Sequence, residues 1–134
     1  MKDSIGKASL KVGQHHFAST MKTGTVNVLS TAILAALMEE ASCDALKTAS
    51  IVSGETTVGT SLNLVHRRPS ALGAEVTAVA KLSNIDKKGV HFDIEAFDET
   101  GLIGTAKHIR VFVNQAEFEK KCMDMSLKSI KKHN

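Results

Sequence analysis

The sequence predicts an α+β fold in which one long apolar helix packs on a largely antiparallel sheet. A run rich in Ala, Leu and Met begins at Thr31, directly after the good N-cap residue Ser30, and is expected to stay helical to about Lys47. Alternating apolar residues and intervening turns then predict four strands, at about 56–66, 74–82, 90–97 and 102–113. Strands joined by tight turns pair antiparallel, and the apolar side of the helix needs a sheet face to cover it.

The two ends of the chain complete a single predicted domain, residues 1–134. Residues 8–22 mix apolar and polar side chains and are expected to form a first strand, with an interruption at Gly13. Residues 115–131 predict a short C-terminal helix whose apolar side runs through Phe118, Cys122 and Met125. A chain of this length buries about two-thirds of its unfolded surface, so it can form a core without disulfides.

Composition and charge exclude several classes of protein. Apolar residues make up 43% and charged residues 23%, which excludes intrinsic disorder. The longest unbroken apolar run, 32–38, is far shorter than the ~20 residues that span a bilayer, and the N-terminus lacks the apolar core of a signal peptide. The net charge is only +3 and the chain has no Trp or Tyr, which argues against nucleic-acid binding. We therefore expect a cytoplasmic protein without a membrane or nucleic-acid partner.

The two adjacent carboxylates of the helix fall on different sides of it. Glu40 lies on the polar side, where it is expected to be solvated and to pair with Lys47 or Lys87. Glu39 instead lies among small or uncharged neighbours, Ala32, Ala35, Cys43 and Leu46. A buried carboxylate needs a specific donor or has a raised pKa, and such groups cluster at functional sites. The alternative is that Glu39 lies at the edge of the apolar face and reaches water.

Thr31 occupies the first turn of the same helix, where backbone N–H groups have no helical partner. A hydroxyl beside such groups suits a developing oxyanion, although Ser30 and Thr31 could equally serve only as caps. Thr31 and Glu39 are two turns apart, roughly 12 Å along the axis. A substrate lying along the helix could therefore contact both side chains.

The strand at 56–66 carries two kinds of side chain. Alternation places Val58, Leu62 and Leu64 on one face and Gly59, Ser61 and Asn63 on the other. The strand ends at His66, before Arg67 and Arg68, which suit phosphate binding or form an ordinary solvated strand end. The histidines lack the HxH and HExxH spacings, so no metal site is expected.

Three segments together resemble the fluoroacetyl-CoA thioesterase-like branch of the hotdog-fold thioesterases. They are residues 29–40, residues 54–66, and residues 97–104 followed by His108 and Arg110. The resemblance extends from about residue 8 to 120. It implies a hotdog fold, in which a curved antiparallel sheet of about five strands wraps a long central helix. It also implies a dimer with acyl-CoA sites near the subunit interface.

The same resemblance implies a site made of Thr31, Glu39 and His66, since the family enzyme of known chemistry uses a Thr, a Glu and a His. The predicted activity is hydrolysis of a short or small acyl-CoA, with CoA as part of the substrate and no metal or other cofactor. Glu39 would act as general base toward water or as nucleophile. Thr31 would hydrogen-bond the acyl group or the attacking species, and His66 would orient a partner or move a proton.

Three further residues are expected to bind substrate. Gly59 would bring its backbone close to the thioester, and Arg67 and Arg68 would contact the CoA phosphates. Segment 18–28 lacks the aromatic residues that line the pocket of the fluoroacetyl-specific enzyme, which leaves the acyl group open. The alternatives to hydrolysis are an acyl-CoA hydratase or dehydratase and a non-catalytic acyl-CoA-binding module. The expected assembly is a homodimer or a tetramer.

Overall fold

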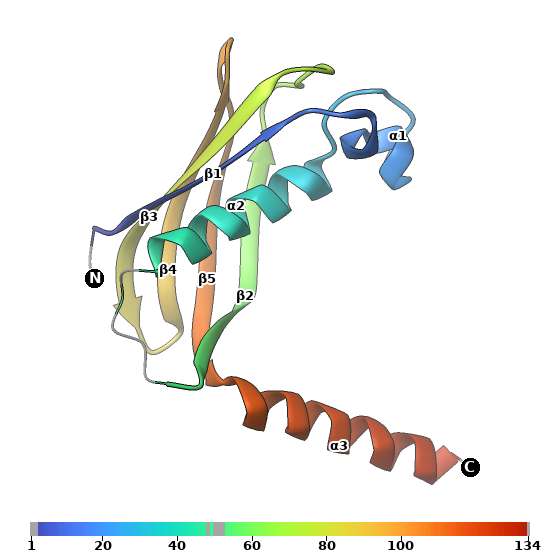
Figure 1. The fold of residues 1–134 in the computed structure, drawn as a ribbon, viewed down its shortest axis with the longest axis vertical. Coiled ribbons are helices and arrows are strands. Elements are labelled where there is room, and N and C mark those ends of the chain that lie inside the picture. The colour runs from blue at the N-terminus through green and yellow to red at the C-terminus, as the bar shows by residue number, and fades with distance from the viewer. Residues whose placement is uncertain (1–2, 48, 50–52, 134) are drawn as a thin grey trace.

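A computed structural model of the chain describes residues 3–47, 49 and 53–133, and it shows a curved antiparallel sheet around one long helix (Figure 1). The helix is α2 (Thr31–Ala45). The sheet has the strand order β1-β3-β4-β5-β2. Its strands are β1 (Ile5–Lys11), β2 (Glu55–His66), β3 (Glu75–Asp86), β4 (Gly89–Asp98) and β5 (Gly101–Asn114).

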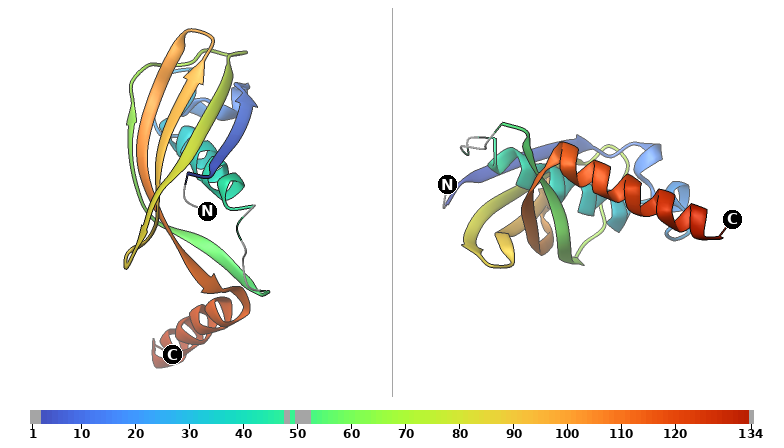
Figure 2. Two further views of the ribbon diagram at one scale, coloured as in Figure 1. Left: turned by 90° about the vertical axis from the view of Figure 1, so that its left-hand side faces the viewer. Right: turned by 90° about the horizontal axis from the view of Figure 1, so that it is seen from below.

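Every neighbouring pair of strands is antiparallel, as the tight turns predict. β1 and β2 form the two edges of the sheet, and the sheet curls so that its concave face holds α2 (Figure 2). The predicted α+β architecture is therefore confirmed. Among the described helices, none has the length and apolar character that a bilayer crossing requires.

The core lies between α2 and the concave face of the sheet. The helix side chains predicted to face the core are all buried, namely Leu34, Leu37, Met38, Ala41 and Ala45. β1 runs so close to the helix that a side chain at Gly6 would overlap the backbone of Ala41 and Ala45. Gly6 thereby lets the edge strand pack directly on α2.

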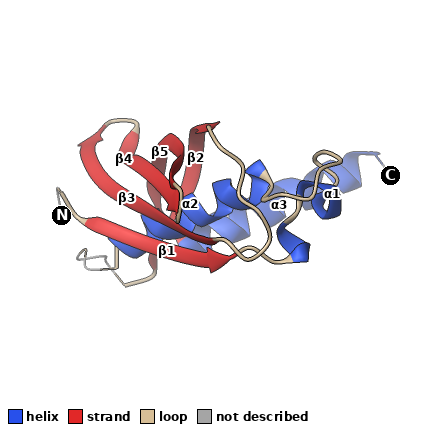
Figure 3. Cartoon of the chain, turned by 90° about the horizontal axis from the view of Figure 1, so that it is seen from above, coloured by secondary structure: helices blue, strands red, loops and turns tan. Residues whose placement is uncertain are grey.

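The prediction of one strand over residues 8–22 is wrong beyond Lys11. A 3-10 turn (Gln14–His16) follows β1, and then the short helix α1 (Ala18–Met21). The backbone N–H of Gly13 donates to His16 Nδ1 at 2.9 Å, and this local bond competes with a strand ladder. Alternation of residue types in this segment reflects a capped turn rather than a strand (Figure 3).

The predicted faces of β2 are wrong before Thr60. The register of β2 against β5 shifts between Gly59 and Ser61, so Thr60 is an extra residue in the strand. Such a bulge reverses which residues face inward. Leu62 and Leu64 face the core as predicted, but Gly59 also lies on the inner side, against side chains of α2 and β5.

The C-terminal helix α3 (Gln115–His133) confirms the predicted helix and ends two residues beyond its predicted end. It continues directly from β5 and projects away from the sheet and from α2 (Figures 1 and 2). Its described side chains, from Gln115 to Ile130, are exposed.

Candidate active site

The first turn of α2 contains a hydroxyl paired with a histidine. Ser30 is the N-cap, because its side chain accepts a hydrogen bond from the backbone N–H of Ile33 at 3.1 Å. Thr31 therefore does not need to cap the helix. Its Oγ1 lies 2.9 Å from Nδ1 of His66, the last residue of β2. The antiparallel path of the sheet brings this strand end to the helix start.

The His66 ring is half-buried and has one unused nitrogen. Burial lowers the pKa of His66, and the backbone at Arg68 partly offsets this shift. The ring is therefore neutral at pH 7. With its proton on Nε2, Nδ1 accepts the Thr31 hydroxyl proton, which is the arrangement of a nucleophile and its base. Within the described part of the chain, the buried Nε2 has no hydrogen-bond partner.

A cavity of about 340 Å³ lies beside this pair. Thr31 and His66 form part of its wall together with Arg67 and Arg68. The other side is mostly apolar and comes from the segment that follows the 3-10 turn, through Ala18, Val26, Val28 and Leu29. The site thus joins a polar pair, an apolar wall and two cations.

Both arginines at this cavity are exposed, and both are partly held by β5 and the turn before it. Arg67 donates through Nε and Nη2 to Thr105 Oγ1, at 3.2 and 3.1 Å. Arg68 donates through Nη1 to the carbonyl of Thr100 at 3.2 Å. Each guanidinium has five N–H donors, so donors remain available for phosphate oxygens.

Glu39 lies further along α2 and pairs with a cation from the sheet. Its Oε1 accepts a hydrogen bond from Arg110 Nη1 at 3.1 Å. The Glu39 side chain is 43% exposed, whereas that of Arg110 is 8% exposed. Sequence reasoning found no charged neighbour for Glu39 on its own helix, and the charged neighbour comes instead from β5. The exposed part of the carboxylate reaches solvent. The two alternatives predicted from the sequence, a specific donor and contact with water, therefore each describe part of the environment of Glu39.

Hydrogen bonds to β2 and β5 hold the guanidinium of the buried Arg110 in place. Its Nε donates to Thr57 Oγ1 at 3.0 Å and its Nη2 to the Thr57 carbonyl at 3.1 Å. Nη1 lies 3.1 Å from Nε2 of the buried His108, whose Nδ1 donates to the Ser61 carbonyl at 2.7 Å. This donation leaves Nε2 as an acceptor for Arg110.

His108 is neutral for the same physical reason as His66. Burial lowers its pKa most, and the Arg110 cation lowers it further, against the Ser61 carbonyl and the Glu39 carboxylate. His108 therefore acts as a fixed acceptor behind Arg110. Its Nε2 lies 3.8 Å from Glu39 Oε1, beyond hydrogen-bonding distance.

Gly59 leaves room for the Glu39 carboxylate where β2 meets this cluster. A Cβ atom at this position would lie 2.6 Å from Glu39 Oε1 and 3.0 Å from His108 Cε1. The absence of a side chain therefore lets the carboxylate approach the strand. A smaller cavity of about 210 Å³ opens here, lined by Glu39, Gly59, Thr60, Ser61, Leu62 and His108.

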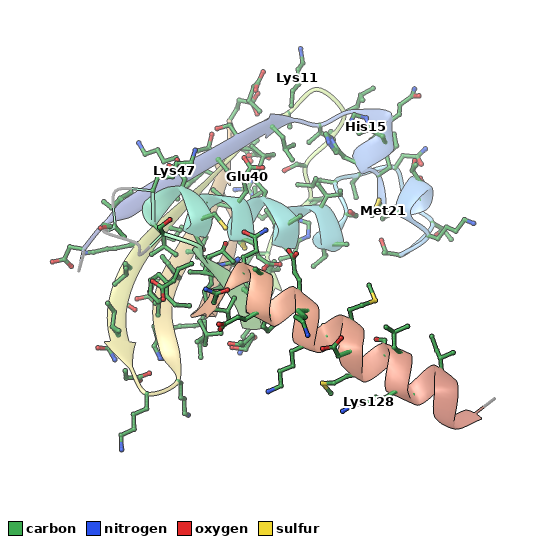
Figure 4. All side chains as sticks on the ribbon, turned by 60° about the horizontal axis from the view of Figure 1, so that its bottom comes forward. Lys11, His15, Met21, Glu40, Lys47 and Lys128 are labelled. Carbon is green, nitrogen blue, oxygen red and sulfur yellow. The ribbon has the colours of Figure 1, made fainter. Side chains whose placement is uncertain are left out.

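The structure thus divides the predicted site residues into two groups along α2. Thr31, His66, Arg67 and Arg68 share the larger cavity, and Glu39 and Gly59 share the smaller one. Glu40 is exposed (Figure 4), and Lys47, one of its two predicted partners, lies 3.5 Å from Asp44. No cluster of three or more His, Cys, Asp or Glu side chains that could hold a metal occurs among the described residues.

Sequence reasoning missed Arg110 and His108 as partners of Glu39. The available signal was their spacing, because two residues on one strand that are separated by one position share a face. Both stand on β5 in line with the buried Ala106. Which residue of the helix they contact depends on the register of β5 and on Gly59.

Comparisons with known proteins identify a family and a fold. The model of the family described as fluoroacetyl-CoA-specific thioesterase, FlK, matches residues 12–116. A crystal structure of an FlK variant is 21% identical, with a TM-score of 0.84 over 93% of this chain and 96% of that one. A hypothetical protein from Thermus thermophilus, a thioesterase superfamily member, is 21% identical, with a TM-score of 0.85 over 100% and 97% of the two chains.

A hot-dog-like protein from Thermanaerovibrio acidaminovorans is 20% identical, with a TM-score of 0.82 over 92% of this chain and 91% of that one. These likenesses confirm the hotdog fold. Among curated proteins, none matches the chain.

Proposed function

The chain belongs to the family of fluoroacetyl-CoA-specific thioesterases, and on this premise we propose that it hydrolyses short acyl-CoA thioesters. Family membership supports thioester hydrolysis as the activity. The observation that carries the proposal is the 2.9 Å contact between Thr31 Oγ1 and His66 Nδ1, beside a cavity with an apolar wall and two arginines. Such a cavity suits an acyl group on one side and CoA phosphates on the other.

Thr31 and the first turn of α2 act on the acyl carbonyl in this proposal. The turn has backbone N–H groups without helical partners at the positive end of the helix dipole, which stabilise negative charge on the carbonyl oxygen. The neutral His66 imidazole accepts the Thr31 hydroxyl proton or orients that hydroxyl toward the substrate. Its contact with Thr31 favours these roles over one in which His66 orients Glu39.

Glu39 acts as the general base toward water. It removes a proton from water, the water oxygen attacks the acyl carbon, and the C–S bond then breaks to release CoA as a thiolate that takes up a proton. Arg110 and His108 position the carboxylate. Within one chain Glu39 is roughly 12 Å along the helix from Thr31, so substrate or a second subunit must connect the two groups.

We also propose a homodimer, because a second subunit could connect Glu39 with Thr31. β2, which carries His66 and Gly59, is an edge strand of the sheet, and an edge strand can pair with a strand of another chain. Pairing of two such edges would bring two copies of the site residues together at one interface. A tetramer built from two such dimers is the alternative assembly, and sedimentation equilibrium distinguishes the two.

The test is release of free thiol from a panel of acyl-CoAs, from short to long and including aryl groups. We expect release, with the highest kcat/KM for short acyl groups because the cavity is about 340 Å³. Absorbance of an enoyl-CoA is followed in parallel. Hydration of the enoyl group without thiol release would contradict the proposal in favour of a hydratase, and tight binding without turnover would favour a binding module.

A further inference from the structure

We propose that α3 is a self-association element, which pairs antiparallel with α3 of a second copy of this chain. The inference is independent of the proposed activity, because α3 projects away from α2 and the sheet (Figure 1) and lines neither of the two cavities. Three properties of the helix carry it: its exposure, the arrangement of its apolar residues and the distribution of its charges.

α3 presents a large apolar surface to solvent. Its five large apolar side chains are between 47% and 64% exposed, namely Phe118, Met123, Met125, Leu127 and Ile130. The helix has 19 residues, about 28 Å, and leaves the sheet directly after β5 (Figure 4). Most helices in proteins depend on packing of an apolar face for stability, so a helix of this kind needs a cover.

The apolar residues form two rows, roughly 140° apart around the helix, and each row has the spacing of a helix–helix seam. Phe118, Cys122 and Met125 form one row, and Met123, Leu127 and Ile130 form the other. Each row steps by four and then three residues, the step that places side chains over one another on one side of a helix. Glu119 lies between the two rows, and the other charged residues up to Lys128 lie on the opposite side, where Lys120 Nζ pairs with Asp124 at 2.9 Å.

The charges along α3 are complementary to those of a second α3 in the opposite direction. Residues 115–124 carry two lysines and three carboxylates, a side-chain charge of 2 − 3 = −1. Residues 125–134 carry three lysines and no carboxylate, a charge of +3. An antiparallel pair places each acidic half beside the basic half of its partner, whereas a parallel pair places like charges together. A two-fold axis generates the antiparallel pair from identical helices.

An anionic membrane is a weaker fit for this face. The three carboxylates of α3 reduce its attraction to anionic lipids, and basic amphipathic helices that bind membranes are rich in Lys and Arg along their polar face. We therefore commit to a second copy of the chain as the occupant.

The first experiment removes the apolar rows without disturbing the helix. We compare the full chain with Met125→Gln/Leu127→Gln by sedimentation equilibrium, since Gln is a good helix former. The matched control is Lys120→Gln/Lys121→Gln, on the charged side. We expect the apolar variant to raise the dissociation constant of the largest species at least about tenfold, with no weakening in the control. Equal dissociation constants for wild type and the apolar variant would overturn the proposal.

A charge exchange tests the antiparallel direction. Lys128→Glu/Lys131→Glu changes the charge of residues 125–134 from +3 to 3 − 4 = −1, so both halves then have the same sign and association should weaken several-fold. Adding Glu117→Lys changes residues 115–124 from −1 to −1 + 2 = +1 and should restore association, because the two halves again have opposite signs. These exchanges oppose the dipole of the helix, so a role of the charges only within one helix predicts that the combined variant is worse. Failure of the combined variant to recover association would overturn the antiparallel pairing.

A crosslink locates the contact on α3. In a Cys43→Ser chain, Cys122 is the remaining thiol, and a short bismaleimide should yield covalent dimers that the Met125→Gln/Leu127→Gln exchange abolishes. Dimers that persist in that variant would overturn the proposal. Vesicles containing phosphatidylserine are the last arm. Binding of wild type but not of the apolar variant to these vesicles, with self-association unchanged, would assign the face to a lipid surface instead.

Discussion

Two polar groups lie along α2, and they differ in how firmly they are held. At the first turn, Thr31 and His66 share one hydrogen bond, and the second ring nitrogen of His66 is buried without a partner among the described residues. Two turns later, Glu39 contacts an arginine that makes further bonds to Thr57 and His108. The first group depends on a single hydrogen bond between its two residues, whereas the second is a fixed network that aims one carboxylate.

Because of this difference, substitutions in the two groups should have different effects on activity and on folding. Substitutions in the first group should change activity with little effect on folding. Substitutions behind Glu39 should affect folding and activity together, because Arg110 and His108 are buried.

The largest effect is expected when the carboxylate itself is neutralised. Glu39→Gln should lower kcat/KM for thiol release about 1,000-fold, because a general base contributes roughly 10²–10⁴. The matched control is Glu40→Gln, one residue away on the exposed side of α2, which should retain full activity. Activity that survives Glu39→Gln would assign the chemistry to the Thr31–His66 pair alone.

The next effect concerns the pair at the helix start. Thr31→Ala and His66→Asn should each lower kcat/KM about 100-fold, and the double variant should be no worse than the poorer single variant, since a hydroxyl and its base act as one unit. Thr31→Ser retains the hydroxyl and should retain most activity. Multiplicative losses in the double variant would show that the two residues act separately.

Removal of the arginine behind Glu39 should mainly affect folding. Arg110→Gln should lower the free energy of unfolding by about 2 kcal/mol, because the Thr57 carbonyl and His108 Nε2 lose a buried donor. Urea denaturation measures this change. The exposed Arg68→Gln should change stability by less than about 0.5 kcal/mol. Equal stability of the two variants would contradict the fixed network described above.

The two arginines at the larger cavity should affect binding more than chemistry. Arg67→Gln/Arg68→Gln should raise KM for an acyl-CoA about tenfold with kcat nearly unchanged, because contacts to distant phosphates stabilise substrate and transition state equally. The same substrate with a short thiol in place of CoA should show no difference between the variant and wild type. An unchanged KM for the CoA substrate would remove both residues from the site.

The smallest effect is a pH dependence of stability. His66 binds its proton less readily in the folded chain than at its ordinary pKa of 6.5, so the unfolded chain holds more protons just below that pH. Stability therefore falls as the pH drops through this range. His66→Asn should reduce the fall between pH 7 and pH 5 by less than about 1 kcal/mol, as followed by urea denaturation. An unchanged fall in His66→Asn would contradict the effect of burial.

Local patterns in the sequence determined most of the secondary structure. The buried side of α2, the strands β3 to β5 and the helix α3 all follow from periodicity and turn residues, because these signals depend on residues close together in the chain. The same reasoning distinguished Glu39 from Glu40, since the position of a side chain around a helix is fixed by local geometry. It failed at residues 12–22, where a side-chain bond at Gly13 forms a turn in place of a strand.

Only the tertiary structure decided what the site residues contact. Glu39 and Arg110 are 71 residues apart, and their contact depends on the pairing of β2 with β5, on the extra residue at Thr60 and on the missing side chain at Gly59. Likewise, the sequence determined that α3 has an apolar side, but only the path of the chain after β5 decided that this side is exposed. The physical reason is the same in both cases. Periodicity determines which way a side chain points from its own element, whereas its partner is determined by the registers and close approaches of elements far apart in the chain.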